Sequence, residues 1–165
     1  MDLNFGKKYK DFTKEVKDFC KKYKGIHFID SSKVPLSGSF KSGEIKMTRS
    51  DWQKILIEKG YFARSIPLEY GGYGGESDII KSRIIAEEFA KSKIPPPMGG
   101  QGIDMLVPTL LELGTEEQKQ KYIKPTLHGE IIWCQGYSEP NAGSDLASLQ
   151  TCLLYTSPSP RDTDK

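Results

Sequence analysis

Residues 133–150 read WCQGYSEPNAGSDLASLQ, and this stretch joins an apolar run to a dense group of polar turn residues. Ile131, Ile132 and Trp133 are β-branched or aromatic, which is typical of a short strand entering a packed layer. From Glu139 to Asp145, proline removes a backbone donor, while glycine, asparagine and aspartate tolerate unusual backbone angles. The sequence therefore predicts one strand near residues 131–138, followed by a tight loop.

A loop of this composition can bind a ligand. It can aim backbone N–H groups outward, and the hydroxyls of Ser138 and Ser144 add further donors. An acceptor-rich group would suit such donors, whether a flavin pyrimidine ring, a phosphate or a thioester carbonyl. From spacing alone, a plain connection is the commoner outcome, because most segments rich in glycine, serine and aspartate only link elements.

Residues 136–148, GYSEPNAGSDLAS, resemble the first signature of the acyl-CoA dehydrogenase family over thirteen successive positions. The departure is Tyr137, where the family pattern has an aliphatic residue. The sequence WCQGYSEP is similar to that of a subgroup that includes dehydrogenases of larger or dicarboxylic acyl-CoA esters. Shorter stretches with similar wording in the family are PLEYGGYGG at residues 67–75 and GTEEQKQKY at residues 114–122.

The resemblance implies a flavoenzyme that uses FAD to form a double bond between the α and β carbons of an acyl-CoA thioester. Carried over by position, Gln135, Tyr137 and Ser138 would lie along the flavin. Gly143 and Ser144 would complete the cofactor-binding loop, and Ser144 would also touch the acyl-CoA substrate. In such chemistry a carboxylate removes the α proton while the β carbon passes a hydride to the flavin.

No catalytic residue is assigned within this chain. Glu139 lies inside the signature, but the glutamate at that position is not the family's base. The base and most of the FAD site are expected beyond these residues, in a β-domain and a four-helix bundle of the longer parent enzyme. We therefore expect the 165-residue chain alone to bind FAD poorly and to lack dehydrogenase activity. An electron-transfer acceptor and a homo- or hetero-oligomeric assembly are also implied for the parent.

Composition excludes several classes of protein. The charge balance of 24 basic against 22 acidic residues gives a net charge of +2, which does not favour a nucleic-acid partner. Three cysteines without C-x-x-C spacing support neither a zinc site nor a disulfide framework. No apolar run approaches the ~20 residues that cross a bilayer, and the N-terminus lacks a signal-peptide core. A cytoplasmic location without a membrane span is expected.

Apolar periodicity predicts a mainly α-helical bundle. The first expected helix covers residues 3–23, and the second is capped by Thr48 or Ser50 and stopped by Gly60. The third runs from Ser77 to the prolines at 95–97, and the fourth is an apolar segment around 105–113 that kinks or starts near Pro108. The fifth is opened by a capping box at Thr115. In the third segment, Ile79, Ile80, Ile84, Ile85, Phe89 and Ala90 should be buried. Residues 25–46 read as a polar connection.

Domain boundaries follow from this pattern. Residues 1–129 are expected to form an N-terminal all-helical domain, and residues 130–151 the first strand and flavin-contacting loop of a truncated β-domain. The four glycines in residues 66–75 match no phosphate-binding spacing, so a tight structural turn is expected there. Residues 152–165 lack periodicity and resemble translated sequencing-adaptor read-through, with a natural disordered tail as the alternative.

Two other functions stay open on the sequence. An acyl-CoA oxidase or flavin monooxygenase of the same fold would share the helices and the flavin strand, and it would differ in the reaction of its reduced flavin with oxygen. A non-catalytic helical interaction module would need an apolar patch that stays exposed after folding. Partner capture without flavin would identify such a module.

Overall fold

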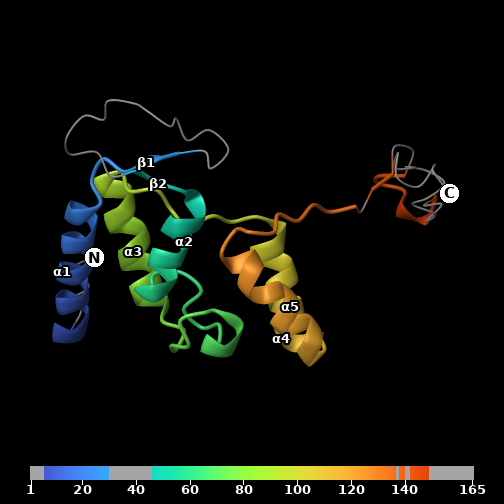
Figure 1. Cartoon of the computed structure of the whole chain (residues 1–165), viewed down its shortest axis with the longest axis horizontal. Coiled ribbons are helices and arrows are strands. Elements are labelled where there is room, and N and C mark those ends of the chain that lie inside the picture. Colours follow the sequence, from blue (N-terminus) through green and yellow to red (C-terminus); the bar gives the residue numbers. More distant parts are fainter. Residues whose placement is uncertain (1–5, 30–45, 137, 140–141, 149–165) are drawn as a thin grey trace, which may run out of the picture. The chain divides into compact units, whose positions relative to one another are not determined.

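A computed structural model describes residues 6–29, 46–136, 138–139 and 142–148 of the chain (Figure 1). Its contacts divide the chain into two units, Met1–Trp133 and Cys134–Lys165. The first unit is mainly helical, which confirms the predicted fold class. Its elements in chain order are α1 (Lys7–Lys22), β1 (His27–Phe28), β2 (Lys46–Met47), α2 (Arg49–Glu58), the short helix η1 (Leu68–Tyr70), α3 (Ile79–Ser92), the π-helical turn η2 (Gly102–Leu106), α4 (Val107–Leu113) and α5 (Glu116–Leu127).

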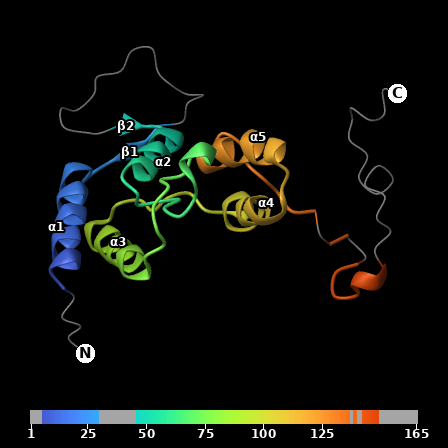
Figure 2. The same ribbon diagram turned by 90° about the horizontal axis from the view of Figure 1, so that it is seen from below.

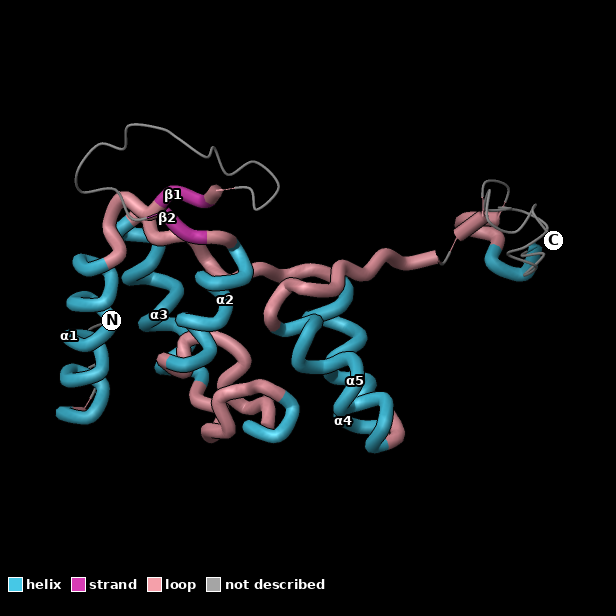
Figure 3. The backbone as a smooth tube through the Cα atoms, viewed as in Figure 1, coloured by secondary structure: helices cyan, strands magenta, loops and turns pink. Residues whose placement is uncertain are grey.

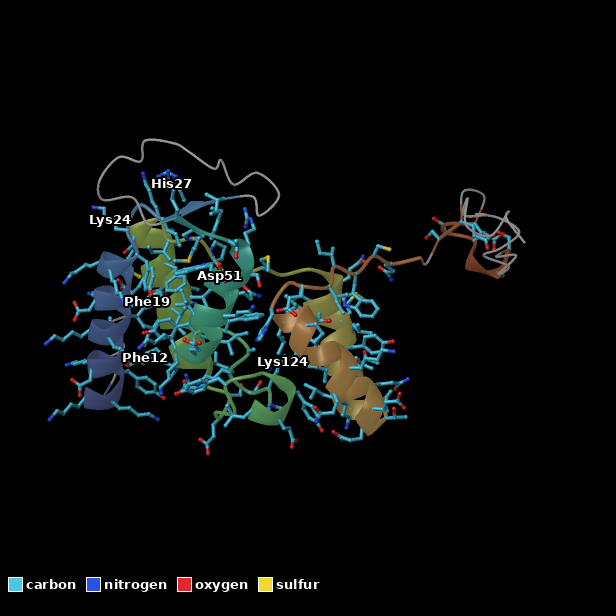
Figure 4. All side chains as sticks on the ribbon, in the orientation of Figure 1. Phe12, Phe19, Lys24, His27, Asp51 and Lys124 are labelled. Carbon is cyan, nitrogen blue, oxygen red and sulfur yellow. The ribbon has the colours of Figure 1, made fainter. Side chains whose placement is uncertain are left out.

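Helix α1 packs along α3 through an aromatic face (Figure 2). Its buried side chains recur at helical spacing, at Phe12, Val16, Phe19 and Cys20. The ring of Phe19 stacks on that of Phe89 from α3, with centroids 5.9 Å apart. Every lysine of α1 is exposed, and Figure 4 shows side chains of this helix projecting away from the other helices, so this basic run is a solvated helix face. The helix begins at Lys7, with Gly6 as its non-helical N-cap, and not at residue 3 as predicted.

Helix α2 is capped by Thr48, one of the two predicted candidates, and the cap is a capping box. The Thr48 hydroxyl accepts a hydrogen bond from the Asp51 N–H at 3.0 Å, and the Asp51 carboxylate accepts one from the Thr48 N–H. Four of its ten residues are buried, namely Trp52, Gln53, Leu56 and Ile57. Burial at adjacent positions shows that α2 has protein packed on two neighbouring sides.

Those two sides belong to two hydrophobic cores. The first core joins α1, α2 and α3 and centres on Phe19, Trp52, Leu56 and Phe89. The second core joins Ile57 of α2 to Tyr70, Val107, Ile123 and Leu127. Helices α4 and α5 contact each other beside this second core (Figure 1). Helix α2 is therefore shared by both cores.

The glycine-rich segment is a structural turn, as predicted. The N–H groups of Gly71, Gly72, Gly74 and Gly75 all donate to carbonyls of residues 64–68, so they cannot cradle a phosphate. Gly72 approaches the backbone of Ile66 so closely that a β-carbon would meet the Ile66 carbonyl oxygen. The turn is tied to α5, because the buried Tyr70 donates its hydroxyl hydrogen to the Glu116 carboxylate at 2.9 Å. This bond, with burial, raises the pKa of Tyr70 to about 12.

Helix α3 differs from the prediction at its first turn. Its N-cap is Asp78 rather than Ser77, and the Asp78 carboxylate accepts from the Lys81 N–H at 3.0 Å. Ile79 is 83% exposed and Ala90 is also exposed, whereas both were expected to be buried. The buried stripe consists of Ile84, Ile85, Glu88 and Phe89. Ile84, Ile85 and Phe89 belong to the first core, and Ile80 is half-buried against it, whereas Ile79 and Ala90 lie on other sides of the helix and remain in solvent.

The fourth predicted helix does begin near its proline. Helix α4 starts at Val107, and Pro108 lies in its first turn. The π-helical turn η2 precedes it. Helix α5 opens with the predicted capping box, in which the Thr115 hydroxyl accepts from the Gln118 N–H at 3.3 Å. It runs to Leu127, beyond the predicted Ile123.

The strand predicted near residues 131–138 is wrong for the described part of that range. Residues 131–136 and 138 carry no strand, and Ile132 is 93% exposed. A strand needs a neighbouring strand for its hydrogen bonds, whereas the Ile131 N–H of this segment donates to the Pro125 carbonyl of α5 at 3.3 Å. The structure instead has a parallel pair of β1 with β2, in a region that was expected to be a plain connection (Figure 3). Residues 152–165, expected to be a tail, lie outside the described residues.

Gly72→Ala is expected to lower the free energy of unfolding by about 2 kcal/mol, because the new methyl group overpacks against the Ile66 backbone. Chemical denaturation followed by far-ultraviolet circular dichroism measures this change. Gly136→Ala is the matched control, since a β-carbon there meets nothing within 4 Å. Equal stability of the two variants would show that the turn can relax around the methyl group.

Candidate functional site

The residues predicted to bind flavin lie in the second unit, in a short irregular segment. Gln135, Ser138, Gly143 and Ser144 are all exposed. Tyr137, the remaining predicted contact, lies outside the described residues. Exposure leaves the hydroxyls of Ser138 and Ser144 accessible to a ligand, which agrees with the donor set that was expected of this loop.

A reciprocal backbone pair organises this loop. The Glu139 N–H donates to the Ala142 carbonyl at 3.2 Å, and the Ala142 N–H donates to the Glu139 carbonyl at 3.1 Å. Ser138 and Gly143 are the next residues outward on the two arms of this antiparallel bridge, so the structure brings these two predicted positions together. Gln135 lies three residues before Ser138.

The short helix η3 (Leu146–Ser148) follows the turn. The Ser148 hydroxyl donates to the Asp145 carbonyl at 2.9 Å, and so does the Ser148 N–H at 3.3 Å. Ser144 therefore sits between a bridge on one side and a closed helical turn on the other. This local bonding fixes the backbone on both sides of Ser144.

The first unit contains a separate small pocket of about 110 Å³ between the segment before α4 and the segment after α5. Its walls are mostly apolar and glycine-rich. They consist of Met98, Gly99, Gly100, Gln101, Gly102, Ile103, Thr126, Gly129, Ile131, Ile132 and Trp133. This volume exceeds the roughly 10–15 Å³ that one water molecule needs, so a small group of a ligand can enter.

One wall of this pocket is the indole of Trp133. Its Nε1 donates to the Thr126 hydroxyl at 2.8 Å, and that hydroxyl donates to the Tyr122 carbonyl at 2.6 Å. The indole also meets the Tyr122 ring edge to face, with centroids 5.6 Å apart. A β-carbon at Gly102 would collide with the indole, so only glycine fits at this point of η2. A π-helical turn beside a pocket often marks a functional site.

The opposite wall is formed by Met98. A β-carbon at Gly129 would collide with the Met98 methyl group, so the two residues are in close contact. The turn on the Gly100 side is closed by Asp104, whose carboxylate accepts from the Gly100 N–H at 2.9 Å. Hydrogen bonds therefore hold both the Trp133 side and the Gly100 side of the pocket.

Charged groups flank the pocket without entering it. Glu130 pairs with Lys54 of α2 at 3.2 Å and lies 3.6 Å from the His128 Nδ1. The hydrogen bond from Lys54 lowers the pKa of Glu130. Burial lowers the pKa of His128, with Glu130 opposing that shift. His128 is therefore neutral at neutral pH, and the pocket interior is apolar.

Sequence reasoning did not find this pocket as such. Its walls come from two segments about 25 residues apart, and their meeting depends on how α4 and α5 pair. The usable signals were the glycines of residues 99–102 and the Trp133 side chain at the end of the apolar run. In the part of the chain that the structure describes, no cluster of three metal-ligating side chains is present. No helix among the described residues has the length and apolar character of a membrane span.

Known proteins with similar sequences include several dehydrogenases. Residues 7–130 match the family model described as "Acyl-CoA dehydrogenase, N-terminal domain". The acyl-CoA dehydrogenase IpdE1 of Mycolicibacterium smegmatis is 37% identical over 116 residues, which is 70% of this chain and 29% of that protein.

Solved structures agree with this match. The ChsE4-ChsE5 complex from Mycobacterium tuberculosis is similar with a TM-score of 0.54 and 25% identity, covering 90% of this chain and 35% of that one. The Tcur3481-Tcur3483 steroid ACAD gives a TM-score of 0.52 and 28% identity, covering 90% and 36%. The chain thus spans about a third of the length of these relatives. Since the family model covers residues 7–130, this chain belongs to the acyl-CoA dehydrogenase family through its N-terminal helical domain.

Proposed function

We propose that this chain is the N-terminal helical domain and flavin-contacting loop of an FAD-dependent enzyme that dehydrogenates acyl-CoA thioesters between the α and β carbons. The observation that carries the proposal is the family match over residues 7–130. The signature at residues 136–148 supports it, because these residues follow directly after the matched domain. In this proposal residues 134–148 open the next domain of the enzyme.

The loop has donors that fit the polar edge of a flavin. Ser138 and Ser144 are exposed, and the Glu139–Ala142 bridge holds Ser138 next to Gly143. Gln135, Tyr137, Ser138 and Gly143 would hold the flavin ring, and Ser144 would contact both the cofactor and the acyl-CoA. Bound FAD would supply the two-electron acceptor that the reaction needs. The donors of the loop would orient the ring and stabilise negative charge on its pyrimidine edge.

The helical unit would serve the acyl group. The pocket between Met98 and Trp133 is apolar, and its charged neighbours Lys54 and Glu130 pair with each other outside it. An apolar wall of this kind favours a hydrocarbon chain over a charged headgroup. It would also keep water away from one side of the bound acyl group.

Assembly with a second dehydrogenase subunit is part of the proposal. Two of the similar structures pair two differently named proteins, ChsE4 with ChsE5 and Tcur3481 with Tcur3483. Substrate size is a further open choice within the family. The Tcur3481-Tcur3483 pair is described as a steroid ACAD, and a 28% identical relative is the glutaryl-CoA dehydrogenase of Desulfococcus multivorans.

The test uses the parent protein, which is obtained by reading the coding frame past Thr151 and is expressed with FAD. Its flavin absorbance is expected to fall when an acyl-CoA is added without oxygen. A panel of short-chain, dicarboxylic and steroid-derived CoA thioesters defines the substrate.

In the same parent protein, Ser138→Ala should weaken FAD binding about tenfold, because one hydrogen bond to the ring is lost. Ser82→Ala makes the same change at an exposed position of α3 and should leave the affinity for FAD unchanged. A flavin that no thioester in the panel reduces would contradict the proposed function.

The 165-residue chain alone is expected to show no acyl-CoA-dependent reduction of an electron-accepting dye, even with added FAD. The physical reason is that a general base and most cofactor contacts would come from sequence outside it. Turnover by the purified chain above a no-enzyme blank would show that residues 1–165 already contain a complete active site.

A further inference from the structure

The side chain of Gln53 is the most deeply buried polar group on α2, with 0% exposure. The nitrogen and the oxygen of its amide both form hydrogen bonds with the backbone of Met98, 45 residues later. Its Nε2 donates to the Met98 carbonyl at 3.3 Å, and its Oε1 accepts from the Met98 N–H at 2.9 Å. This is the hydrogen-bond pattern that a neighbouring strand would offer to Met98.

The adjacent residue on α2 holds the same segment. Trp52, which is 1% exposed, donates from its indole Nε1 to the Pro95 carbonyl at 3.1 Å. Residues 95–98 have no strand or helix of their own, so the Pro95 carbonyl and the N–H and carbonyl of Met98 depend on these side chains. Three hydrogen bonds from α2 thus fix the path of the chain between α3 and the pocket.

Met98 is where this path reaches the pocket. Its side chain forms the wall against Gly129, and no residue of α2 lines the pocket. A shift of the Met98 backbone would move this wall away from Gly129 and Trp133. The shape of the pocket is therefore set by a helix that does not touch its interior.

We infer that Gln53 is a positioning residue for the substrate pocket, acting through the paired amide that holds Met98 in the pocket wall. The inference rests on the proposed function only in treating this pocket as part of the substrate site. Gln53 contacts neither substrate nor cofactor in this role. Its removal would leave the N–H and carbonyl of the half-buried Met98 without the Gln53 amide, which favours movement of the segment.

The test uses the 165-residue chain labelled with ¹³C at the methionine methyl groups. The chain has four methionines, and Met98→Leu assigns the Met98 signal. In Gln53→Met, which keeps a similar volume without polar atoms, the Met98 methyl signal is expected to move to the position of a mobile methionine. Amide exchange at Met98 should become about tenfold faster, as expected for a lost hydrogen bond. The Met47 signal, from β2 beside the first core, should stay in place.

Gln53→Glu separates a positioning role from simple filling of space. A protonated glutamic acid can donate to the Met98 carbonyl and accept from its N–H, whereas the ionised form cannot donate. Burial raises the pKa of such a carboxyl group. The Met98 signal should therefore match the unsubstituted chain at low pH and match Gln53→Met at high pH. The unsubstituted chain over the same pH range accounts for titration of nearby His128 and Glu130.

Dissolved xenon, an apolar probe, reports on the pocket itself. It should shift the Met98 methyl signal in the unsubstituted chain and in the control Gln120→Met, which makes the same change on the exposed face of α5. It should not do so in Gln53→Met.

Unchanged Met98 and xenon responses in a folded Gln53→Met chain would overturn the inference. If that variant fails to fold, as shown by loss of the Met47 signal position, the pH series of Gln53→Glu decides alone, and a Met98 signal insensitive to pH would overturn it. None of these readouts uses flavin or a thioester. Failure here is therefore distinct from failure of the proposed function.

Discussion

Burial of α2 on two sides is the constraint on which the helical unit depends. Trp52 and Leu56 complete the core shared with α1 and α3, while Ile57 completes the core shared with α4 and α5. Leu56 is 0% exposed, so little solvent reaches the helix between these cores. A ten-residue helix is too short to persist alone in water, so its stability comes from these contacts. The two cores in turn meet through it.

The same burial explains why polar side chains of α2 can direct an irregular segment. Inside a protein, an amide left without a partner costs roughly 1–3 kcal/mol, which keeps the Gln53 pair closed. The segment 95–98 then enters the pocket in one arrangement, and the Trp133 indole is fixed on the other side by Thr126. Met98 in one wall is held by Gln53, which lies outside the pocket, whereas Trp133 in the other wall is held by Thr126, which is itself a lining residue.

Local signals in the sequence were reliable, and signals that depend on distant partners were not. The caps at Thr48 and Thr115, and the helix start near Pro108, follow from residues within one turn of the chain. The strand expected at residues 131–138 needed a partner strand that local composition cannot supply. Tertiary contacts also limited what could be foreseen of the helical domain, since the exposure of Ile79 depends on where α1 crosses α3.

The site was foreseen only in part, for the same reason. The role of Gln53 was hidden, since its partner lies 45 residues away. For the loop predicted to contact flavin, the family signature predicts the residues, whereas the Glu139–Ala142 bridge is seen only in the structure.

The pairing of His27 with Lys46 and of Phe28 with Met47 has a consequence for how this family can diverge. Two parallel rungs hold the ends of the intervening segment beside each other, and the Arg49 guanidinium covers the Phe28 ring at 4.7 Å. Closing a loop of twice the length costs only about 0.6 kcal/mol more in chain entropy. Insertions and deletions between these rungs can therefore accumulate through evolution while the helical cores keep the same residues in contact.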